Sequence, residues 1–303
     1  HGMSREYGQA LVRQVAARGQ WQVDGLPGRR LRVGLVSTDF RQHPVAYFLE
    51  NVLRSLKNRH GDSLELLAYH CDGREDAMTQ RLKPFFGQWR QCAALPDSAL
   101  ADLVYDDRVD ILIDLIGYTT RPRLGAFAGR PAPVQVSWLG YFATTGLDRM
   151  DYVLADPLCL PPEGDQLYTE QVWRLPRTRL CLTPPGEEIA VGPLPARANG
   201  HVTFGCFNNL SKVNDLVLAA WSRILAALPD SRLLIKTQEL AVESSAQAFR
   251  QRLEQAGIST HRVRFEPGSD RRAYLDSYNG IDIALDPFPY PGGTTTAESL
   301  WMG

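Results

Sequence analysis

The stretch DPFPYPGGTTTAESLWMG, residues 286–303, decides the fold when it is taken with the apolar run IDIALD at 281–286. An apolar run followed at once by Pro and Gly predicts the end of a buried strand, a loop and the first turns of a helix. Gly292 and Gly293 remove side chains at a point where the backbone must approach something closely. Strand, loop and helix in this order predict an α/β unit.

The start of this predicted helix has the chemistry of a phosphate site. Thr294, Thr295 and Thr296 offer hydroxyl groups, and the unpaired N–H groups of a helix start lie at the positive end of the helix dipole. Phosphate groups bind in such places. A second interpretation stays open, because Thr295 and Glu298 have capping-box spacing and Glu298 could serve only to cap the helix.

Upstream of this turn, apolar runs alternate with helix patterns along most of the chain. The runs predict strands at 31–38, 64–70, 109–115, 132–141, 151–160, 201–208, 232–237 and 262–267. Helix patterns lie at 4–19, 44–58, 75–86, 97–107, 213–228, 241–256 and 270–279. Strands that alternate with helices predict βαβ units and a parallel, doubly wound sheet.

The alternation is interrupted by a segment rich in Pro, Gly and small polar residues at 184–200, which is typical of an interdomain linker. We therefore expect a helix and lead-in at 1–29, a Rossmann-like domain at 30–183 and a second one at 201–303. The second domain shows only four strand-like runs, where a doubly wound domain usually has five or six. We expect that domain to be incomplete in this chain.

Composition argues against several classes of protein. The chain has 303 residues, 44% hydrophobic content and a formal net charge of -1, with 33 basic and 34 acidic residues mixed along it. This balance disfavours a nucleic-acid partner, and no apolar run approaches the ~20 residues of a membrane span. Five scattered cysteines without CxxC pairs and six isolated histidines predict neither a disulfide framework nor a zinc site, and they fit a reducing cytoplasm.

Three loops fall beyond the carboxyl ends of predicted strands, where ligands of open parallel sheets bind. They hold His43, Lys212 and the turn at 292–298, and they would converge on one cleft if the two sheets face each other. Lys212 could pair with a diphosphate or be a surface lysine. His43 could take a proton near neutral pH or only cap the helix that follows. The Gly- and Thr-rich loop at 138–146 suits contact with a sugar, although an ordinary strand-to-helix turn has the same composition.

Six blocks of the sequence together resemble the catalytic region of the O-GlcNAc transferase family, bacterial branch. They are STDFRQHPV, DILIDLIGYTTRPR, RPAPVQVSWLGYFATTG, MDYVLADP, FGCFNNLSKV and DPFPYPGGTTTAESLWMG. Each block is modest alone, but they occur in family order over about residues 30–303, and the ordered series is specific. The family normally carries tetratricopeptide repeats before this region, and only the helix at 4–19 could belong to one.

The resemblance implies a GT-B glycosyltransferase, with two Rossmann-like domains and a nucleotide sugar bound between them. It implies transfer of N-acetylglucosamine from UDP-GlcNAc to Ser or Thr hydroxyls of proteins, with inversion and without a metal cofactor. The sequence agrees on the metal, because it has no DxD carboxylate pair to hold Mg²⁺ or Mn²⁺ on a diphosphate. The negative charge on the leaving diphosphate would then be stabilised by Lys212, the threonine N–H groups and the helix dipole.

The resemblance also assigns roles to single residues. By position, His43 matches the proposed general base, Lys212 the lysine on the UDP phosphates, and Glu298 an acid that holds the ribose. The expected nucleotide site comprises Asn209, Lys212, Tyr274, Gly293, Thr294, Thr295, Thr296 and Glu298, and the expected sugar loop comprises Gly140, Tyr141 and Thr144.

The chain departs from the family pattern at the nucleotide site. Gly293 stands where the animal enzymes carry histidine, Tyr274 falls near another such position, and Asn209 falls where glutamine is frequent. The pocket for the base is therefore expected to be built differently.

Two other activities stay open on the sequence alone. A related GT-B transferase could use UDP-glucose, or could modify asparagine or a glycan. A noncatalytic module could keep the nucleotide site and recruit protein partners. A dinucleotide-dependent oxidoreductase is disfavoured, because no GxGxxG follows the first strand.

Overall fold

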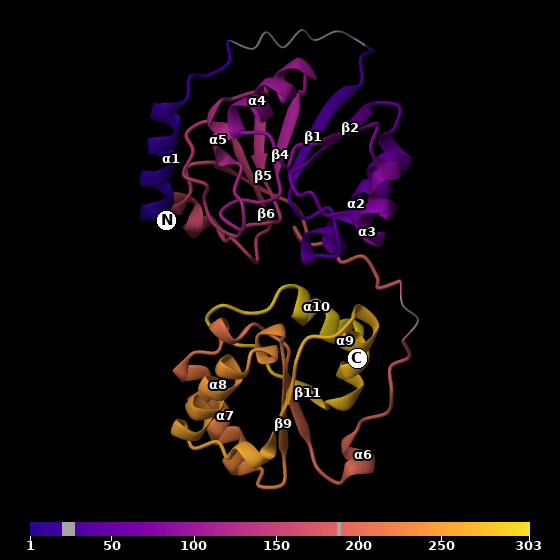
Figure 1. The fold of residues 1–303 in the computed structure, drawn as a ribbon, viewed down its shortest axis with the longest axis vertical. Coiled ribbons are helices and arrows are strands. Elements are labelled where there is room, and N and C mark those ends of the chain that lie inside the picture. Colours follow the sequence, from indigo (N-terminus) through magenta and orange to yellow (C-terminus); the bar gives the residue numbers. More distant parts are fainter. Residues whose placement is uncertain (20–27, 187–188) are drawn as a thin grey trace. The chain divides into compact units, whose positions relative to one another are not determined.

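The computed structural model describes residues 1–19, 28–186 and 189–303, and it divides the chain into two compact units (Figure 1). Unit 1 comprises His1–Thr183 and unit 2 comprises Pro184–Gly303. Each unit is a parallel sheet with helices on both faces, so the predicted α/β, doubly wound fold class is confirmed. Within the described ranges, no helix is long and apolar enough to cross a lipid bilayer.

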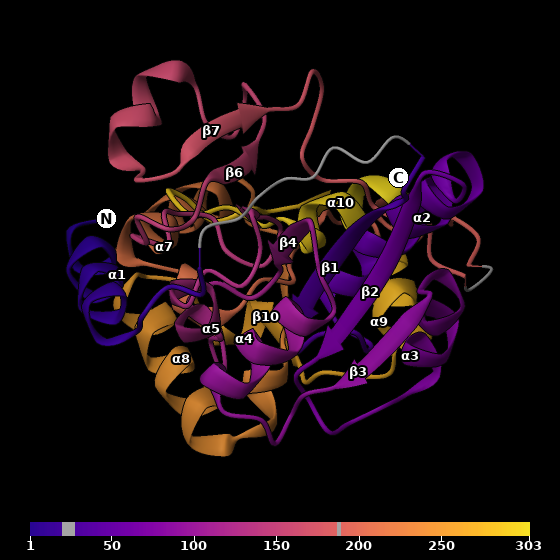
Figure 2. The same cartoon turned by 90° about the horizontal axis from the view of Figure 1, so that it is seen from above.

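The sheet of unit 1 has seven strands in the order β3-β2-β1-β4-β5-β6-β7, and every neighbouring pair is parallel. Figure 2 shows β3 and β7 at opposite ends of this sheet. The central strand β1 is buried over its last five residues, as its continuous apolar run predicts. The strands are β1 (Leu31–Ser37), β2 (Leu64–His70), β3 (Gln88–Gln91), β4 (Ile111–Asp114), β5 (Val134–Ser137), β6 (Tyr152–Ala155) and β7 (Gln171–Arg174).

Helices cover both faces of this sheet and bury a separate apolar cluster on each (Figure 1). One face packs Tyr69 and Leu112 against its helices, and the other packs Leu35 and Leu66. The first face carries α1 (Gly2–Gln14), α4 (Asp97–Asp106) and α5 (Leu124–Ala128), and the second carries α2 (Pro44–His60) and α3 (Ala77–Leu82).

Unit 2 has a four-stranded parallel sheet in the order β10-β9-β8-β11. Its strands are β8 (Thr203–Cys206), β9 (Arg232–Lys236), β10 (Val263–Glu266) and β11 (Ile283–Ala284). Helices α7 (Asp215–Ala227) and α8 (Glu243–Gln255) cover one face, and α9 (Arg271–Asp276) and α10 (Thr294–Trp301) cover the other (Figure 1).

The segment predicted as a linker is attached to unit 2 where the structure describes it. It contains the short helix α6 (Ala196–Asn199). The N–H group of Gly192 donates to Asn279 Oδ1 at 2.8 Å, and the N–H group of Ala196 donates to Asp282 Oδ1 at 2.9 Å. Short 3-10 turns complete the fold at Lys83–Phe85, Pro162–Leu167, Leu210–Lys212, Gln238–Ala241, Thr260–Arg262 and Ser277–Gly280.

The buried strand predicted at 281–286 is wrong. Strand β11 has only two residues, Ile283 and Ala284, and both are exposed. They pair with β8 on one side and lie at the edge of the sheet, so an apolar sequence does not lead to burial there.

Other elements also differ from prediction, among them β3, which was not among the predicted strands. The helix predicted at 4–19 ends at Gln14, because Val15 adopts an extended conformation and packs against the core. The helix predicted at 75–86 is divided into α3 and the turn Lys83–Phe85. Strand β7 has no apolar run of the kind that was used to predict strands, since its burial alternates.

The order of strands fixes where ligands can approach each sheet. In unit 1 the order reverses between β1 and β4, and in unit 2 it reverses between β8 and β11. Loops on either side of such a reversal turn to opposite faces, which leaves a crevice beyond the carboxyl ends of the strands. His43 follows β1, Lys212 follows β8 and the turn at 292–298 follows β11, so all three predicted loops are at those ends.

Candidate functional site

Asp286 organises the loop between β11 and α10. Its carboxylate accepts hydrogen bonds from Thr296 Oγ1 and from the N–H group of Gly292, each at 2.7 Å, and from Asn208 Nδ2 at 3.2 Å. Asn208 Oδ1 in turn accepts a 3.1 Å bond from Thr295 Oγ1. One carboxylate therefore holds the loop, the helix start and the end of β8 together. Asp286 is not among the predicted site residues, although an acid between a strand and a Gly-rich loop is a signal for this role.

The close approach predicted for Gly292 is confirmed, and what it approaches is its own loop. A Cβ atom at Gly292 would lie 2.2 Å from Thr295 Oγ1 and 2.6 Å from Thr296 Oγ1. A Cβ atom at Gly293 would meet nothing within 4 Å. Only the first glycine is therefore required by packing, and position 293 has space for a side chain.

Helix α10 begins at Thr294 without a side-chain cap, and Gly293 is its N-cap residue. The capping-box interpretation of Thr295 and Glu298 is therefore wrong. The N–H groups of the first helical turn have no partner four residues earlier within the helix, and they lie at the positive end of its dipole. Anion binding at this helix start stays a prediction.

Glu298 is buried and forms an ion pair with Arg271 at the start of α9. Its side chain is 2% exposed, and burial raises its pKa while the Arg271 guanidinium opposes that shift. The carboxylate predicted to hold a ribose is thus already paired with Arg271 within unit 2. Ribose binding by Glu298 stays a prediction, and it would require the sugar to share the carboxylate with Arg271.

Tyr274 belongs to an aromatic cluster on the same side of unit 2. Its ring meets Phe207 edge-on at 5.7 Å, and Phe207 stacks on Tyr278 at 4.0 Å. The hydroxyl groups of Tyr274 and Tyr278 are 3.3 Å apart, and burial raises the pKa of Tyr274. Contact between Tyr274 and a nucleotide base stays a prediction.

Lys212 is directed into the loop at 286–296. Its Nζ atom donates to the carbonyl of Pro291 at 3.0 Å and to Asn208 Oδ1 at 3.4 Å, and it lies 4.6 Å from the centre of the Tyr290 ring. Burial lowers its pKa, and the nearby Asp286 carboxylate opposes the shift. Lys212 is therefore not the solvated surface lysine of the alternative interpretation.

Asn209 is exposed and has a local structural role. Its side chain accepts a 2.9 Å hydrogen bond from the N–H group of Ser211 and caps the short turn that ends at Lys212. The turn chemistry of asparagine accounts for this residue without a ligand.

A hollow of about 390 Å³ opens beside the loop in unit 2. Polar groups of Asn208, Asp286, Thr295 and Thr296 line one side of it, together with apolar side chains such as Phe207. Lys212, Tyr274 and Glu298 are not among its lining residues. The predicted nucleotide residues therefore surround the loop, but they do not all face this hollow.

A second cavity, of about 260 Å³, lies at the carboxyl ends of β1, β2 and β4 in unit 1. His43 and Gly140, two of the predicted residues, line it. Apart from Val45, the rest of its wall carries threonine, aspartate and arginine side chains, none of which was predicted from the sequence. Their signal was available, since each follows the end of a predicted strand.

His43 is the N-cap residue of α2, and its imidazole has two possible partners. Nδ1 accepts a 3.3 Å hydrogen bond from the N–H group of Val45, and the same atom lies 3.6 Å from Asp39 Oδ1. The capping bond requires a neutral ring with its proton on Nε2. A bond to Asp39 would place the proton on Nδ1 and leave Nε2 free to accept one. Burial lowers the pKa of His43, which favours the neutral ring.

Asp72 and Asp39 are bound to arginines along the wall of this cavity. Arg74 donates to Asp72 Oδ2 at 2.7 Å, and its hydrogen bonds lower the pKa of Asp72 to about 2. Arg41 donates to Asp39 Oδ1 at 3.3 Å, and its Nε atom lies 3.5 Å from Asp72 Oδ2. Arg121 approaches Asp72 Oδ1 at 3.9 Å. The cavity is therefore lined by fixed charges of both signs.

Buried hydrogen bonds hold the loop at 138–146 in place. Thr144 is fully buried, and its hydroxyl group donates to Glu170 Oε2 at 2.7 Å. Thr144 therefore shapes the loop, and its contact with a sugar stays a prediction. Tyr141 packs edge-on against Tyr118 at 5.4 Å.

Gly140 is required where it stands. A Cβ atom at this position would lie 1.9 Å from the carbonyl oxygen of Leu115. The neighbouring Gly117 has a φ of 59° and lies against Tyr141, so two main-chain segments are in contact here. This part of the cavity wall is made of backbone.

The carboxylates at the cavity of unit 1 and at the loop of unit 2 already have hydrogen-bond or ion-pair partners within the protein. Asp39 and Asp72 pair with arginines, and Asp286 accepts from hydroxyl, amide and N–H donors. In residues 1–19, 28–186 and 189–303, no three His, Cys, Asp or Glu side chains are grouped so that they could hold a metal ion.

Comparison with known proteins identifies relatives along the chain. The profile of glycosyl transferase family 41 matches residues 17–181. Two curated plant relatives are each a probable UDP-N-acetylglucosamine–peptide N-acetylglucosaminyltransferase SPINDLY, from Solanum lycopersicum (38% identical over 307 residues) and Hordeum vulgare (40% over 304 residues). Each match covers 99% of this chain and 32% of the relative. The chain thus spans about a third of the length of these relatives.

Solved structures share the fold of this chain. A mutant O-GlcNAc transferase from Thermobaculum terrenum is 40% identical, with a TM-score of 0.90, over 99% of this chain and 56% of that chain. The lipopolysaccharide outer core galactosyltransferase WaaB shares the fold alone, at 13% identity and a TM-score of 0.56 over 90% of this chain and 78% of its own. The predicted GT-B fold class is confirmed by these neighbours.

Proposed function

The chain belongs to glycosyl transferase family 41, and from this premise we propose that it forms the sugar-transferring part of a protein glycosyltransferase. The proposed reaction moves N-acetylglucosamine from UDP-GlcNAc to Ser or Thr hydroxyls of proteins, with inversion and without a metal ion. The names of the plant relatives, which specify UDP-N-acetylglucosamine and a peptide acceptor, support this donor and this acceptor. The O-GlcNAc transferase from Thermobaculum terrenum supports the same choice.

The observation that carries the proposal is that Lys212 contacts the loop that leads into α10, since its Nζ atom donates to the carbonyl of Pro291, three residues before the helix begins at Thr294. When the bond between the sugar and UDP breaks, negative charge grows on the leaving diphosphate. An ammonium group and unpaired N–H groups that are already in place stabilise this charge without having to reorganise. Lys212 and residues Thr294 to Thr296 supply those groups.

His43 is proposed to act on the acceptor hydroxyl. As a general base it must present an unprotonated Nε2, so its Nδ1 must carry the proton and turn from the N–H group of Val45 toward Asp39. In the capping state Nε2–H would instead donate to the hydroxyl oxygen and orient it. Asp39 is therefore the residue that selects between the two roles.

An assay of the intact protein with separate UDP- and GDP-linked sugars tests the proposal. Each donor is incubated with a library of Ser/Thr peptides, and the products are identified by mass spectrometry. Transfer from UDP-GlcNAc that survives EDTA, with a β-linked product by NMR, is the expected result. Transfer only from another donor, or only to asparagine, contradicts the stated specificity. UDP binding without transfer or donor hydrolysis contradicts the assignment as an enzyme.

Gly292→Ala is expected to weaken UDP binding about tenfold, while Gly293→Ala changes it little. The new Cβ at position 292 displaces the hydroxyl groups of Thr295 and Thr296 and weakens their hydrogen bonds to the Asn208 amide and the Asp286 carboxylate, which costs about 1–2 kcal/mol. At Gly293 the same methyl group enters open space. Titration calorimetry with UDP measures both variants, and equal affinities would show that loop packing does not set binding.

The rate of transfer is expected to stay constant from neutral pH down past the ordinary titration range of histidine, about pH 6.5. Burial holds the pKa of His43 below that range, so the ring stays neutral and active, and the rate falls only at lower pH. A profile of kcat/KM against pH measures this fall in rate on the acid side, the acid limb of the profile. His43→Ala should remove the limb and lower transfer more than UDP binding. An unchanged acid limb in the variant would assign it to another group.

A further inference from the structure

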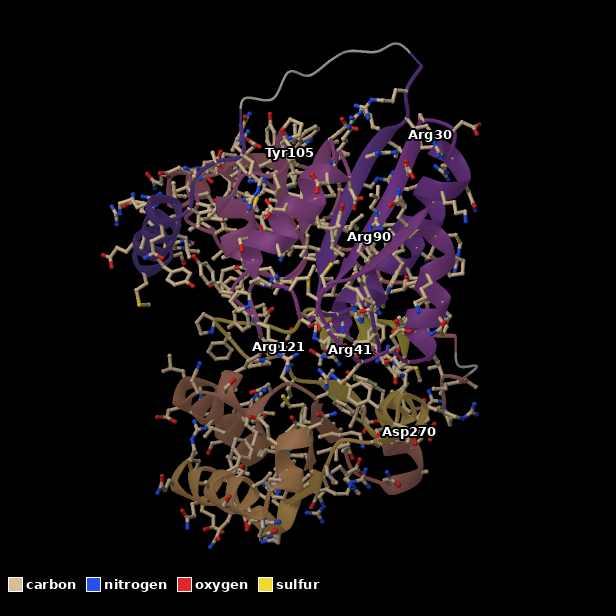
Figure 3. All side chains as sticks on the ribbon, turned by 45° about the horizontal axis from the view of Figure 1, so that its top comes forward. Arg30, Arg41, Arg90, Tyr105, Arg121 and Asp270 are labelled. Carbon is tan, nitrogen blue, oxygen red and sulfur yellow. The ribbon has the colours of Figure 1, made fainter. Side chains whose placement is uncertain are left out.

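Three arginines meet at the cavity of unit 1, and the transfer chemistry described above leaves them without a role. Arg41 follows β1, Arg74 follows β2 and Arg121 follows β4, and all three line the cavity. Figure 3 shows Arg41 and Arg121 at one edge of unit 1, with Arg30 and Tyr105 at the opposite edge. The arginines therefore gather at the ligand-binding edge of the sheet.

The charges of this cluster do not balance. Its two acids, Asp39 and Asp72, are buried, and their side chains are 9% and 6% exposed. The hydrogen bonds from Arg74 lower the pKa of Asp72 to about 2, so this carboxylate is ionised throughout the physiological range. Two carboxylates face three guanidinium groups, and one positive charge is left over while His43 is neutral.

Arg121 is the arginine whose donors remain available. Its only ion pair to the described part of the chain is the 3.9 Å approach to Asp72, which is too long for a hydrogen bond, and its side chain is 67% exposed. Its backbone has a φ of 59°, in the left-handed region that residues other than glycine rarely adopt. Such backbone outliers concentrate at functional sites. The planar fork of an arginine matches a carboxylate in geometry.

We propose that Arg121, supported by Arg74, binds a carboxylate of the acceptor polypeptide, from an Asp or Glu close in sequence to the modified hydroxyl. The inference rests on the proposed function, because it takes a protein as the acceptor. One excess positive charge matches a carboxylate better than a dianionic phosphate. Since His43 lines the same cavity, a carboxylate held by Arg121 brings the neighbouring hydroxyl to the imidazole.

The test compares peptides that differ by one charge. Glu or Gln is placed in turn at each of the three positions on either side of a central serine, and kcat/KM is measured with the intact protein. A charge-assisted hydrogen bond predicts about a tenfold preference for Glu at one position. Arg121→Gln should abolish that preference, so that the Glu and Gln peptides react at equal rates with the variant. Arg121→Glu should reverse it toward a Lys peptide.

Arg108→Gln is the matched control. Arg108 is also an exposed arginine with a positive φ, of 50°, but it precedes β4, at the opposite edge of the sheet. This variant should keep the full preference for Glu. A preference that survives Arg121→Gln, or no preference at any position, overturns the proposal. So does an equal rise of the donor KM with every peptide, because that result would place the arginine on the donor.

Direct binding separates failure of this inference from failure of the proposed function. Fluorescence anisotropy with labelled Glu and Gln peptides measures binding of the carboxylate without any transfer. If no nucleotide sugar is used but Arg121→Gln still removes a preference in binding, the proposed function fails and the carboxylate site stands. If transfer occurs and the Glu and Gln peptides bind and react alike, the site fails alone.

Discussion

Replacing Lys212 by alanine is expected to lower turnover by about a hundredfold to a thousandfold, the range found when one preorganised donor to a developing oxyanion is removed. The Lys212 ammonium is held 3.0 Å from the carbonyl of Pro291, at the mouth of the loop that Asp286 organises. A diphosphate that replaces this carbonyl as the partner gains negative charge as the sugar leaves, so the loss should be greater in kcat than in donor affinity. Single-turnover kinetics with the intact protein measures both.

Two further variants make this expectation specific. Lys212→Arg keeps the charge but changes its geometry, so it should recover only part of the turnover. Lys57→Ala removes an exposed lysine of α2 and should change nothing. If turnover in Lys212→Ala stays within a few-fold of the wild-type value, the leaving group is stabilised by other groups.

Arg271→Met is expected to lower the free energy of unfolding by about 3–5 kcal/mol, the cost of leaving one partner of a buried ion pair alone. The Glu298 side chain is 2% exposed, and Arg271 is the partner that opposes the burial-driven rise of its pKa. Without Arg271 that pKa rises further above its value in the unfolded chain, so folding is favoured where Glu298 is protonated. The deficit is therefore largest at neutral pH and shrinks toward the ordinary range of glutamate, about pH 4.3.

Urea titrations at several pH values measure this effect. Arg272→Met, a change at the exposed neighbour, should stay within about 0.5 kcal/mol of the wild-type stability. Adding Glu298→Gln to Arg271→Met should restore part of the loss, because the unpaired charge is gone. A deficit that does not vary with pH and is not relieved by the second change would show that packing, and not charge, is lost.

The fold could be predicted from the sequence wherever burial follows from apolar content. The run LRVGLVS gives β1 because a central parallel strand is covered on both faces. The run IDIALD fails as a buried strand because burial there depends on the position of β11 at the edge of the sheet, which its own residues do not encode. Strand β7 was missed for the opposite reason, since its alternating burial resembles a polar segment.

The position of the candidate site could be predicted from the sequence. The ion-pair partners of its residues could be predicted less well. A strand end, a glycine loop and a helix start locate Lys212 and the threonines, because these signals are local. The partner of Glu298 is Arg271, 27 residues earlier, and only tertiary packing brings the two together. The Asp39 and Asp72 cluster was missed for the same reason, since its members follow different strands.

The backbone contact at Gly140 limits how this protein can change over evolutionary time. Any side chain there would collide with the carbonyl of Leu115, so that section of the cavity does not tolerate substitution. Under the proposed acceptor site, changes in which polypeptides bind are therefore expected at side chains of the same cavity, such as Arg74 and Arg121. A wall made of main chain beside charged side chains would let acceptor preference change while the backbone of the cavity stays the same.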